Sequence, residues 1–140
     1  MIIRIAQPTE YDKVRELYQA CNYNGGIHDN DVVVIAEDGD ELIGAVRLCP
    51  EHGIKVLRGM QIKSAYCRRG TGTLMLKFMQ ENVDMTDCYC LPYTHLKIFY
   101  GQIGFGEISP AEAPDFLAER LEDYLERGLE VLVMKMRNSK

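Results

Sequence analysis

Two glycines spaced one residue apart, Gly70 and Gly72, separate a stretch with strand character from a stretch with helix character. A strand that breaks into a glycine turn and then starts a helix places free backbone N–H groups around one concavity, and the positive end of the helix dipole points into it. The glycines let the backbone approach an anion closely, and Arg68 and Arg69 can add charge-assisted hydrogen bonds. The segment 62–76 is therefore predicted to be a phosphate cradle.

The composition favours one globular domain. The chain has 140 residues, of which 46% are hydrophobic and 26% charged, as is ordinary for a soluble protein of single-domain size. The net charge of −5 argues against a nucleic-acid partner, because nucleic-acid-binding proteins carry a basic face. No apolar run is long enough to cross a bilayer, and the N-terminus lacks a basic segment followed by a signal-peptide core. We expect a single domain over residues 1–140, located in the cytoplasm, with no membrane or nucleic-acid partner.

The cysteines are predicted to be free thiols. An odd count and the absence of any C-x-x-C motif weigh against a disulfide framework or a zinc site. No cluster of His, Cys and Asp residues suggests another metal, so we expect no metal ion. The five cysteines are Cys21, Cys49, Cys67, Cys88 and Cys90.

In the first half of the chain, apolar runs and turn residues predict strands over residues 1–6, 32–36, 42–48 and 54–62. A helix is predicted over residues 10–21, with Thr9 as its N-cap. The run 32–36 is continuously apolar, which indicates a strand buried on both faces. Turns over 37–40 and 50–53 connect the later strands.

In the second half, strands and helices alternate. The patterns predict a helix over 71–82, a strand over 88–91, helices over 94–103 and 115–127, and a strand over 131–136. The apolar side of the first of these helices is expected to consist of Leu74, Met75, Phe78 and Met79. The order β-α-(α)-β-β-β-α-β-α-α-β predicts an α/β fold whose mixed sheet has helices on both faces.

The spacing of the cradle excludes two common phosphate loops. A Walker A loop requires G-x-x-x-x-G-K-[ST], which this segment lacks. A Rossmann loop requires G-x-G-x-x-G after the first strand of a βαβ unit, whereas Met75 occupies the third glycine position here.

The segment from Ile62 to Gly72 resembles the acyl-CoA-binding signature of the GNAT acyltransferase superfamily, commonly written R/Q-x-x-G-x-G/A. The segment 99–105, Phe-Tyr-Gly-Gln-Ile-Gly-Phe, resembles the second signature, in which an aromatic pair on a helix precedes Gly-Phe at the following strand. Both lie in the family's order, and the resemblance spans residues 1–136. It implies a mostly antiparallel central sheet in which the strand ending at Ile62 and the strand at 88–91 form a splayed parallel pair.

The resemblance also implies acetyl-CoA as co-substrate. The pantetheine arm would bond to the backbone around Gln61 and Ile62, and the pyrophosphate would rest on the cradle. The residues that the resemblance assigns to the cradle are Cys67, Arg68, Arg69, Gly70, Thr71, Gly72 and Thr73. Two positions depart from the family pattern: Cys67 stands where Arg or Gln is usual, and Tyr93 stands near where many members have Asn.

Acyl transfer to an amine requires a proton for the departing thiolate. Tyr100 sits where the family often places a tyrosine that contacts the CoA sulfur, and it is the predicted general acid; packing against the sheet is the alternative. The general base is not evident, and the candidates are His95, Glu37, Tyr89 or an ordered-water chain. Asp29 and Asp31 lie in the loop expected to cover the acceptor groove, where they could favour a cationic amine or be solvated.

The resulting hypothesis is an acetyl-CoA-dependent N-acetyltransferase in which a primary amine of a small molecule or protein attacks the thioester directly. The alternative is a non-catalytic acyl-CoA-binding module that regulates a partner. A nucleotide phosphotransferase is disfavoured, because the required Lys and metal-binding Asp pattern is absent. A homodimer is expected, because most soluble oligomers are symmetric homo-oligomers and dimers are the commonest of these.

Overall fold

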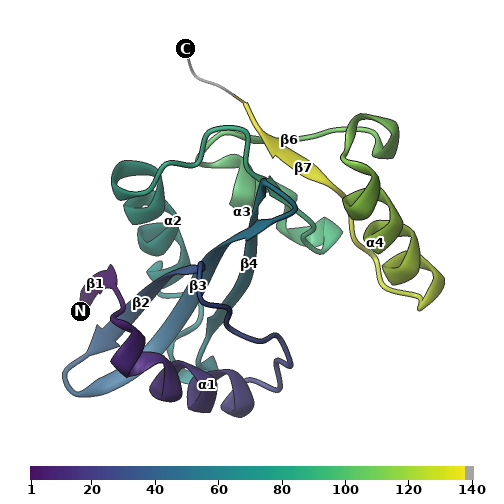
Figure 1. The fold of residues 1–140 in the computed structure, drawn as a ribbon. Helices are drawn as coiled ribbons and strands as arrows, with labels where there is room; N and C mark the ends of the chain where they lie inside the picture. Colours follow the sequence, from purple (N-terminus) through teal and green to yellow (C-terminus); the bar gives the residue numbers. More distant parts are fainter. Residues whose placement is uncertain (138–140) are drawn as a thin grey trace. The chain divides into compact units, whose positions relative to one another are not determined.

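The structure, a computed structural model, describes residues 1–137 (Figure 1). The chain divides into two compact units, Met1–Asp84 and a second that begins at Met85. Within the described residues, no helix combines the length and apolar character needed to span a bilayer.

The first unit contains four strands that pair antiparallel in chain order: β1 (Ile2–Ile5), β2 (Val32–Asp38), β3 (Glu41–Glu51) and β4 (Ile54–Ile62). The predicted strand 54–62 is confirmed at both ends. Strand β3 is longer than the predicted 42–48, because its two flanking turns are two residues long rather than four. Both residues of the second turn, His52 and Gly53, have positive φ, as the favoured type I′ hairpin turn requires.

Helices cover both faces of this sheet, as predicted. Helix α1 (Tyr11–Ala20) follows the short 3₁₀ helix η1 (Pro8–Glu10) and packs on a core that includes Val33, Ile35 and Ala45. Helix α2 (Thr71–Asn82) places Met75 against Gly44. Because successive strand residues point to opposite faces, Gly44 and Ala45 put the two helices on opposite sides of the sheet.

Two details of these helices differ from the prediction. The N-cap of α1 is Glu10 and not Thr9, because a 3₁₀ turn that starts at Pro8 precedes the helix. Gln7 caps that turn, and its N–H donates to the Glu10 carboxylate at 2.8 Å. In α2, Leu74 is 47% exposed, whereas Leu76 is fully buried. The buried face is formed by Gly72, Met75, Leu76 and Met79, which follow the helical spacing of three and four residues.

The second unit has a three-stranded antiparallel sheet in which β7 (Met134–Met136) pairs with both β5 (Tyr89–Cys90) and β6 (Phe105–Glu107). Its helices are η3 (Thr94–Leu96), α3 (Lys97–Gly101), η4 (Pro110–Glu112) and α4 (Asp115–Glu126). The predicted element order lacked β6, because three residues are too short to show a period. The predicted strand 131–136 is also shorter: Val131 makes only an isolated bridge with Tyr93.

The mixed α/β class and the mostly antiparallel pairing are confirmed. The splayed parallel pair would take β4 from one unit and β5 from the other, and it stays a prediction.

Candidate functional site

The predicted cradle has the expected strand–turn–helix form. Strand β4 ends at Ile62, the 3₁₀ helix η2 (Ser64–Tyr66) follows, and Gly70 is the N-cap of α2 with φ +81°. Glycine adopts this left-handed conformation without steric cost, and it has no side chain that could cap the helix. In the part of the chain that the structure describes, the amides of residues 68–73 donate no hydrogen bond to the protein. They therefore remain available to an anion.

The two arginines of the cradle are exposed. Arg68 has φ +65°, which is unusual for a residue with a side chain and costs about 1–2 kcal/mol. The Arg69 guanidinium lies 5.3 Å from the centre of the Tyr66 ring, a cation–π distance. Strained backbone next to an open helix N-terminus is typical of a ligand-binding loop.

Cys67 lies at the start of this turn, and its polar groups face the preceding residues. Its amide donates to the Ser64 carbonyl at 3.3 Å, and its thiol lies 3.6 Å from the Ile62 carbonyl oxygen. The unpaired run of amides thus begins at Arg68.

A carboxylate on β3 ties η2 to the sheet. Glu41 accepts from the Lys63 ammonium at 3.0 Å and from the Tyr66 hydroxyl at 3.1 Å. The hydrogen bond from Lys63 lowers the pKa of Glu41. These contacts fix the segment that leads from β4 into the cradle.

Immediately before the predicted pantetheine contacts, β4 contains a bulge. Gln61 pairs with Ala45, but Arg58 pairs with Arg47, so two residues of β4, Gly59 and Met60, lie opposite Val46. Gly59 has φ +70°. A bulge disrupts the ladder locally and re-aims the backbone, and bulges are over-represented beside active sites.

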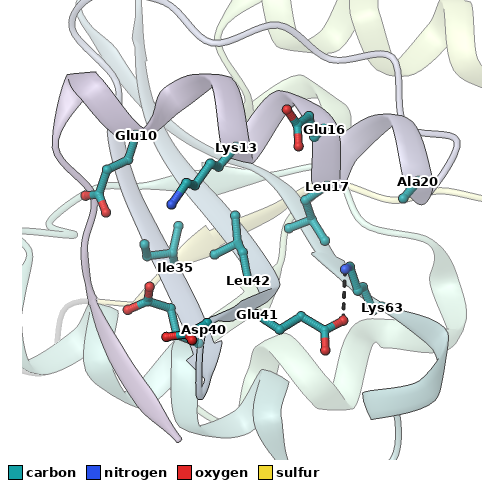
Figure 2. Close-up of a pocket in the computed structure, with 11 residues that line it drawn as sticks. Glu10, Lys13, Glu16, Leu17, Ala20, Ile35, Asp40, Glu41, Leu42 and Lys63 are labelled. Carbon is teal, nitrogen blue, oxygen red and sulfur yellow. Dashed lines mark hydrogen bonds and ion pairs between the residues drawn. The ribbon is translucent and has the colours of Figure 1, made fainter.

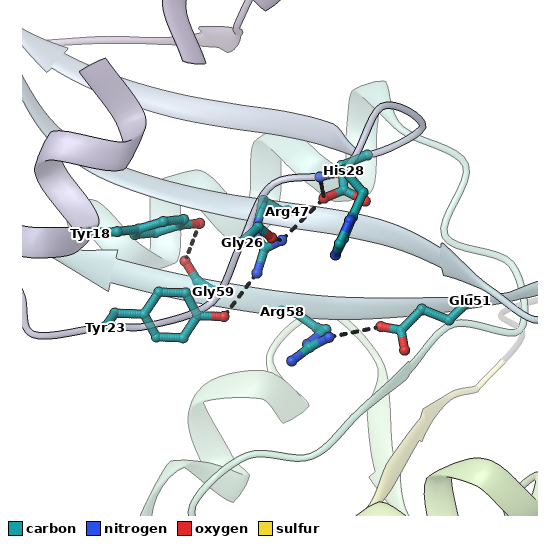
Figure 3. A network of polar contacts seen from close by, with 9 residues as sticks. Tyr18, Tyr23, Gly26, His28, Arg47, Glu51, Arg58 and Gly59 are labelled. Atoms are coloured by element: carbon teal, nitrogen blue, oxygen red, sulfur yellow. Dashed lines mark hydrogen bonds and ion pairs between the residues drawn. The ribbon is translucent and has the colours of Figure 1, made fainter. Parts of the chain in front are cut away.

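A buried polar network lies beside this bulge (Figure 3). Arg47 is 1% exposed, and its guanidinium donates to Asp31 at 3.1 Å, to the Tyr23 hydroxyl at 2.9 Å and to the Gly26 carbonyl. Asp31 is therefore paired with Arg47, which corrects the prediction that its carboxylate could attract a cationic amine. Asp29 in the same loop is exposed.

The predicted general acid belongs to the second unit. Tyr100 lies on α3, is 8% exposed, and packs edge-on against Phe99 and Phe105, with ring centres 4.9 and 6.2 Å away. The ring therefore contributes to the core of its unit. The predicted role of Tyr100 as general acid depends on its hydroxyl group and stays a prediction.

A family model described as an acetyltransferase (GNAT) domain matches residues 29–107, which is more than half of the chain and includes the cradle, the bulge and Tyr100. The chain belongs to the GNAT acetyltransferase family. None of the curated protein sequences compared with it matches.

Solved structures of other proteins share the fold along nearly the whole chain. An aminoglycoside 6′-N-acetyltransferase in complex with coenzyme A is 16% identical, with a TM-score of 0.66 over 100% of this chain and 99% of that one. A Mycobacterium tuberculosis protein in complex with CoA is 15% identical, with a TM-score of 0.68 over 99% of both chains. An acyl-CoA N-acyltransferase from Pseudomonas aeruginosa is 19% identical, with a TM-score of 0.66 over 98% of this chain and 100% of that one.

The candidate general bases of this GNAT protein differ in their surroundings. The Glu37 carboxylate accepts a hydrogen bond from the Arg4 guanidinium at 2.9 Å. Tyr89 is buried, with the Lys135 ammonium 5.5 Å from its ring centre. His95 is exposed and stacks on Tyr93 at 5.8 Å.

The GNAT protein also has a pocket of about 430 Å³ between α1 and the β2–β3 hairpin (Figure 2). Several of its charges are already paired: Glu10 and Glu37 with Arg4, and Glu41 with Lys63. Its lining includes none of the residues predicted to bind the cofactor. The lining consists of Glu10, Lys13, Glu16, Leu17, Ala20, Ile35, Glu37, Asp40, Glu41, Leu42 and Lys63.

Sequence reasoning missed the bulge and its network. Two features of the sequence could have indicated them. Gly59 lies inside a predicted strand, where a glycine often marks a bulge. Arg47 is a charged residue within an otherwise apolar predicted strand, which points to a buried polar network. The hydroxyl of Tyr18 carried no signal, because its position fits the apolar face of α1 equally well.

Proposed function

We propose that this protein is an acetyl-CoA-dependent N-acetyltransferase that transfers an acetyl group to a primary amine. The observation that carries the proposal is the run of unpaired amides over residues 68–73 at the start of α2, in a chain of the GNAT family. Coenzyme A is present in the solved structures of two proteins with the same fold, and its diphosphate is the anion that best fits a helix N-terminus flanked by two arginines.

In this proposal the cofactor runs from the cradle back along β4. Its diphosphate accepts hydrogen bonds from the amides of Arg68 to Thr73, and its pantetheine arm bonds to the backbone of Gln61 and Ile62. The acyl end then comes next to the bulge at Gly59 and Met60. A bulge there is consistent with a backbone that serves a ligand rather than a neighbouring strand.

The chemistry requires three groups. The neutral amine attacks the thioester carbonyl carbon, the carbonyl oxygen becomes an oxyanion, and the C–S bond then breaks to release CoA thiolate. Tyr100 gives its phenolic proton to that thiolate, since a phenol with an ordinary pKa near 10 is protonated at neutral pH. A base or water takes the proton that the amine loses.

The test combines cofactor binding with thiol release. We expect calorimetry to detect CoA and acetyl-CoA binding, and a thiol-release assay with acetyl-CoA to detect at least one acceptor among small amines, amino acids, polyamines and peptides. Binding without release across the panel would favour a regulatory acyl-CoA-binding module. Binding of ATP with magnesium but not of CoA would contradict both functions.

Tyr100→Phe separates the catalytic role of this residue from its packing. Phenylalanine keeps the contacts with Phe99 and Phe105, so we expect turnover to fall more than cofactor affinity. Unchanged turnover would remove Tyr100 from the mechanism.

A further inference from the structure

The peptide between Gly59 and Met60 has partners that an ordinary strand peptide lacks. The Gly59 carbonyl accepts a hydrogen bond from the Tyr18 hydroxyl of α1 at 2.9 Å (Figure 3). Tyr18 is 2% exposed, and burial raises the pKa of its phenol above the ordinary value. The hydroxyl is therefore protonated throughout the physiological pH range and remains a donor.

Arg47 holds the Tyr18 ring in this position. Its guanidinium carbon lies 5.6 Å from the centre of the Tyr18 ring and 5.9 Å from that of Tyr23, and the two tyrosine rings meet edge-on with centres 4.6 Å apart. The guanidinium is anchored by Asp31, in an ion pair whose two side chains are each 1% exposed.

The fit around Gly59 leaves no spare room. A Cβ atom at this position would lie 2.5 Å from the Tyr18 hydroxyl oxygen and 2.9 Å from Arg47 Nε. Arg47 Nε is buried and, among the residues that the structure describes, has no hydrogen-bond acceptor. The other guanidinium nitrogens of Arg47 are hydrogen-bonded to Asp31, Tyr23 and Gly26, so the side chain is held in place beside Gly59.

The hydrogen bond from Tyr18 to the Gly59 carbonyl also fixes the Met60 N–H, which belongs to the same peptide group. In a trans peptide the C=O and N–H bonds point in opposite directions, and no peptide bond within residues 1–137 is cis. By holding the Gly59 carbonyl toward α1, Tyr18 therefore sets the direction of the Met60 N–H. Met60 directly precedes Gln61, where the proposed path of the pantetheine arm ends.

We propose that Tyr18, supported by Arg47, is a positioning residue for acyl transfer: it fixes the Gly59–Met60 peptide so that the Met60 N–H is aimed at the acyl group. The inference rests on the proposed function, because it places the acyl end of acetyl-CoA next to the bulge. Tyr18 touches the protein backbone and not the cofactor, so it acts on the reaction through Met60.

The kinetic test compares two conservative changes on the same helix. Tyr18→Phe removes only the hydroxyl that holds the bulge, whereas Tyr11→Phe removes a hydroxyl elsewhere on α1. For an amine that the wild type acetylates, we expect Tyr18→Phe to lower kcat about tenfold. This is less than the roughly 10²–10³-fold loss caused by removing an oxyanion donor outright, because the Met60 N–H remains and only its direction is released. The KM for acetyl-CoA and the affinity for CoA should stay within about twofold. Tyr11→Phe should change none of these values, and an unchanged kcat in Tyr18→Phe would overturn the proposal.

A second readout does not require turnover. Acetyl-CoA and CoA differ only in the acetyl group, so in wild-type protein the Met60 amide resonance should differ between the two complexes. We expect that difference to be lost in Tyr18→Phe and kept in Tyr11→Phe; its persistence in Tyr18→Phe, or its absence in the wild type, would overturn the positioning role. If Tyr18→Phe does not fold, the same comparison is made in Arg47→Lys. We expect the difference between the Met60 amide resonances of the two complexes to be smaller in this variant than in wild type, and an unchanged difference would overturn the positioning role.

The two proposals fail in different ways. Wild-type protein that binds neither CoA nor acetyl-CoA would refute the proposed function and this inference with it. Wild-type protein that binds both, combined with a normal Tyr18→Phe variant, would refute the positioning role alone.

Discussion

Two features of position 59 favour glycine over other residue types. Its φ of +70° lies in the left-handed region, and its Cα faces the Tyr18 hydroxyl and Arg47 without space for a Cβ atom. Gly53 has only the first feature: its φ is +77°, and a Cβ atom added there would have nothing within 4 Å among the described residues. A comparison of substitutions at the two positions therefore distinguishes the cost of a left-handed backbone from the cost of a steric clash.

We predict that Gly59→Ala destabilises the protein by about 3 kcal/mol, the sum of left-handed strain and overpacking. Gly53→Ala should cost about 1 kcal/mol, because only the strain applies. Urea unfolding of the two variants against wild type measures both values. Equal losses would show that the space beside Gly59 can relax.

Glu10 makes stability depend on pH in the acid range. Hydrogen bonds from Arg4 lower the pKa of Glu10 to about 2, so the carboxylate is charged in the folded protein at pH values where it is protonated in the unfolded chain. A lowered carboxyl pKa adds stability above the unfolded value near 4.3, and this stability is lost as the pH falls toward 2. Arg4 is 36% and Glu10 24% exposed, so solvent screens the pair.

We therefore expect Glu10→Gln to lower the free energy of unfolding by up to about 1 kcal/mol at pH 7. The difference from wild type should shrink as the pH falls from about 5 toward 2, because wild-type Glu10 becomes protonated as well. Urea unfolding at several pH values follows this change. A difference that did not vary with pH would assign the effect to packing.

At the scale of elements, the parts with strong patterns were predictable. The strand 54–62 and the helix 71–82 appear with the predicted bounds, because a Gly-containing turn separates two different hydrophobic periods. Strand β6 was missed because three residues carry no period. The bulge was missed because the register between strands depends on contacts between residues far apart in the sequence, such as the hydrogen bond from the Tyr18 hydroxyl to the Gly59 carbonyl. The network around Arg47 likewise depends on a loop whose path the local sequence does not determine.

The two arginines of the cradle are expected to contribute to CoA binding. Exchanging both Arg68 and Arg69 for alanine should weaken CoA binding at least about tenfold, since each charge-assisted hydrogen bond to phosphate contributes about 1.5–3 kcal/mol. The backbone amides remain, so binding should persist at higher CoA concentration. Calorimetry measures the change, with Arg15→Ala as control because Arg15 is an exposed arginine of α1 that pairs with Asp12. Undiminished affinity would place the diphosphate elsewhere.

At the scale of the whole molecule, the two compact units raise the question of cooperativity. The predicted cradle belongs to the first unit and Tyr100 to the second, so the proposed reaction requires both. A chain of this length usually unfolds in one cooperative transition. We therefore expect the two units to unfold together, as one domain over residues 1–140 would.

We predict one calorimetric transition that shifts upward with acetyl-CoA. At a hundredfold excess over the dissociation constant, binding stabilises the folded state by about 2.7 kcal/mol. That corresponds to a rise in Tm of roughly 5–15 °C for a chain of this size. Two transitions, of which acetyl-CoA shifted only one, would show that the units unfold separately.

The place of β7 in the second unit has a consequence for biosynthesis. This strand comes last among the elements, yet it pairs with both β5 and β6. Neither pairing can form before the ribosome has translated Met134 to Met136. A premature stop codon upstream of Met134 would therefore abolish both pairings together.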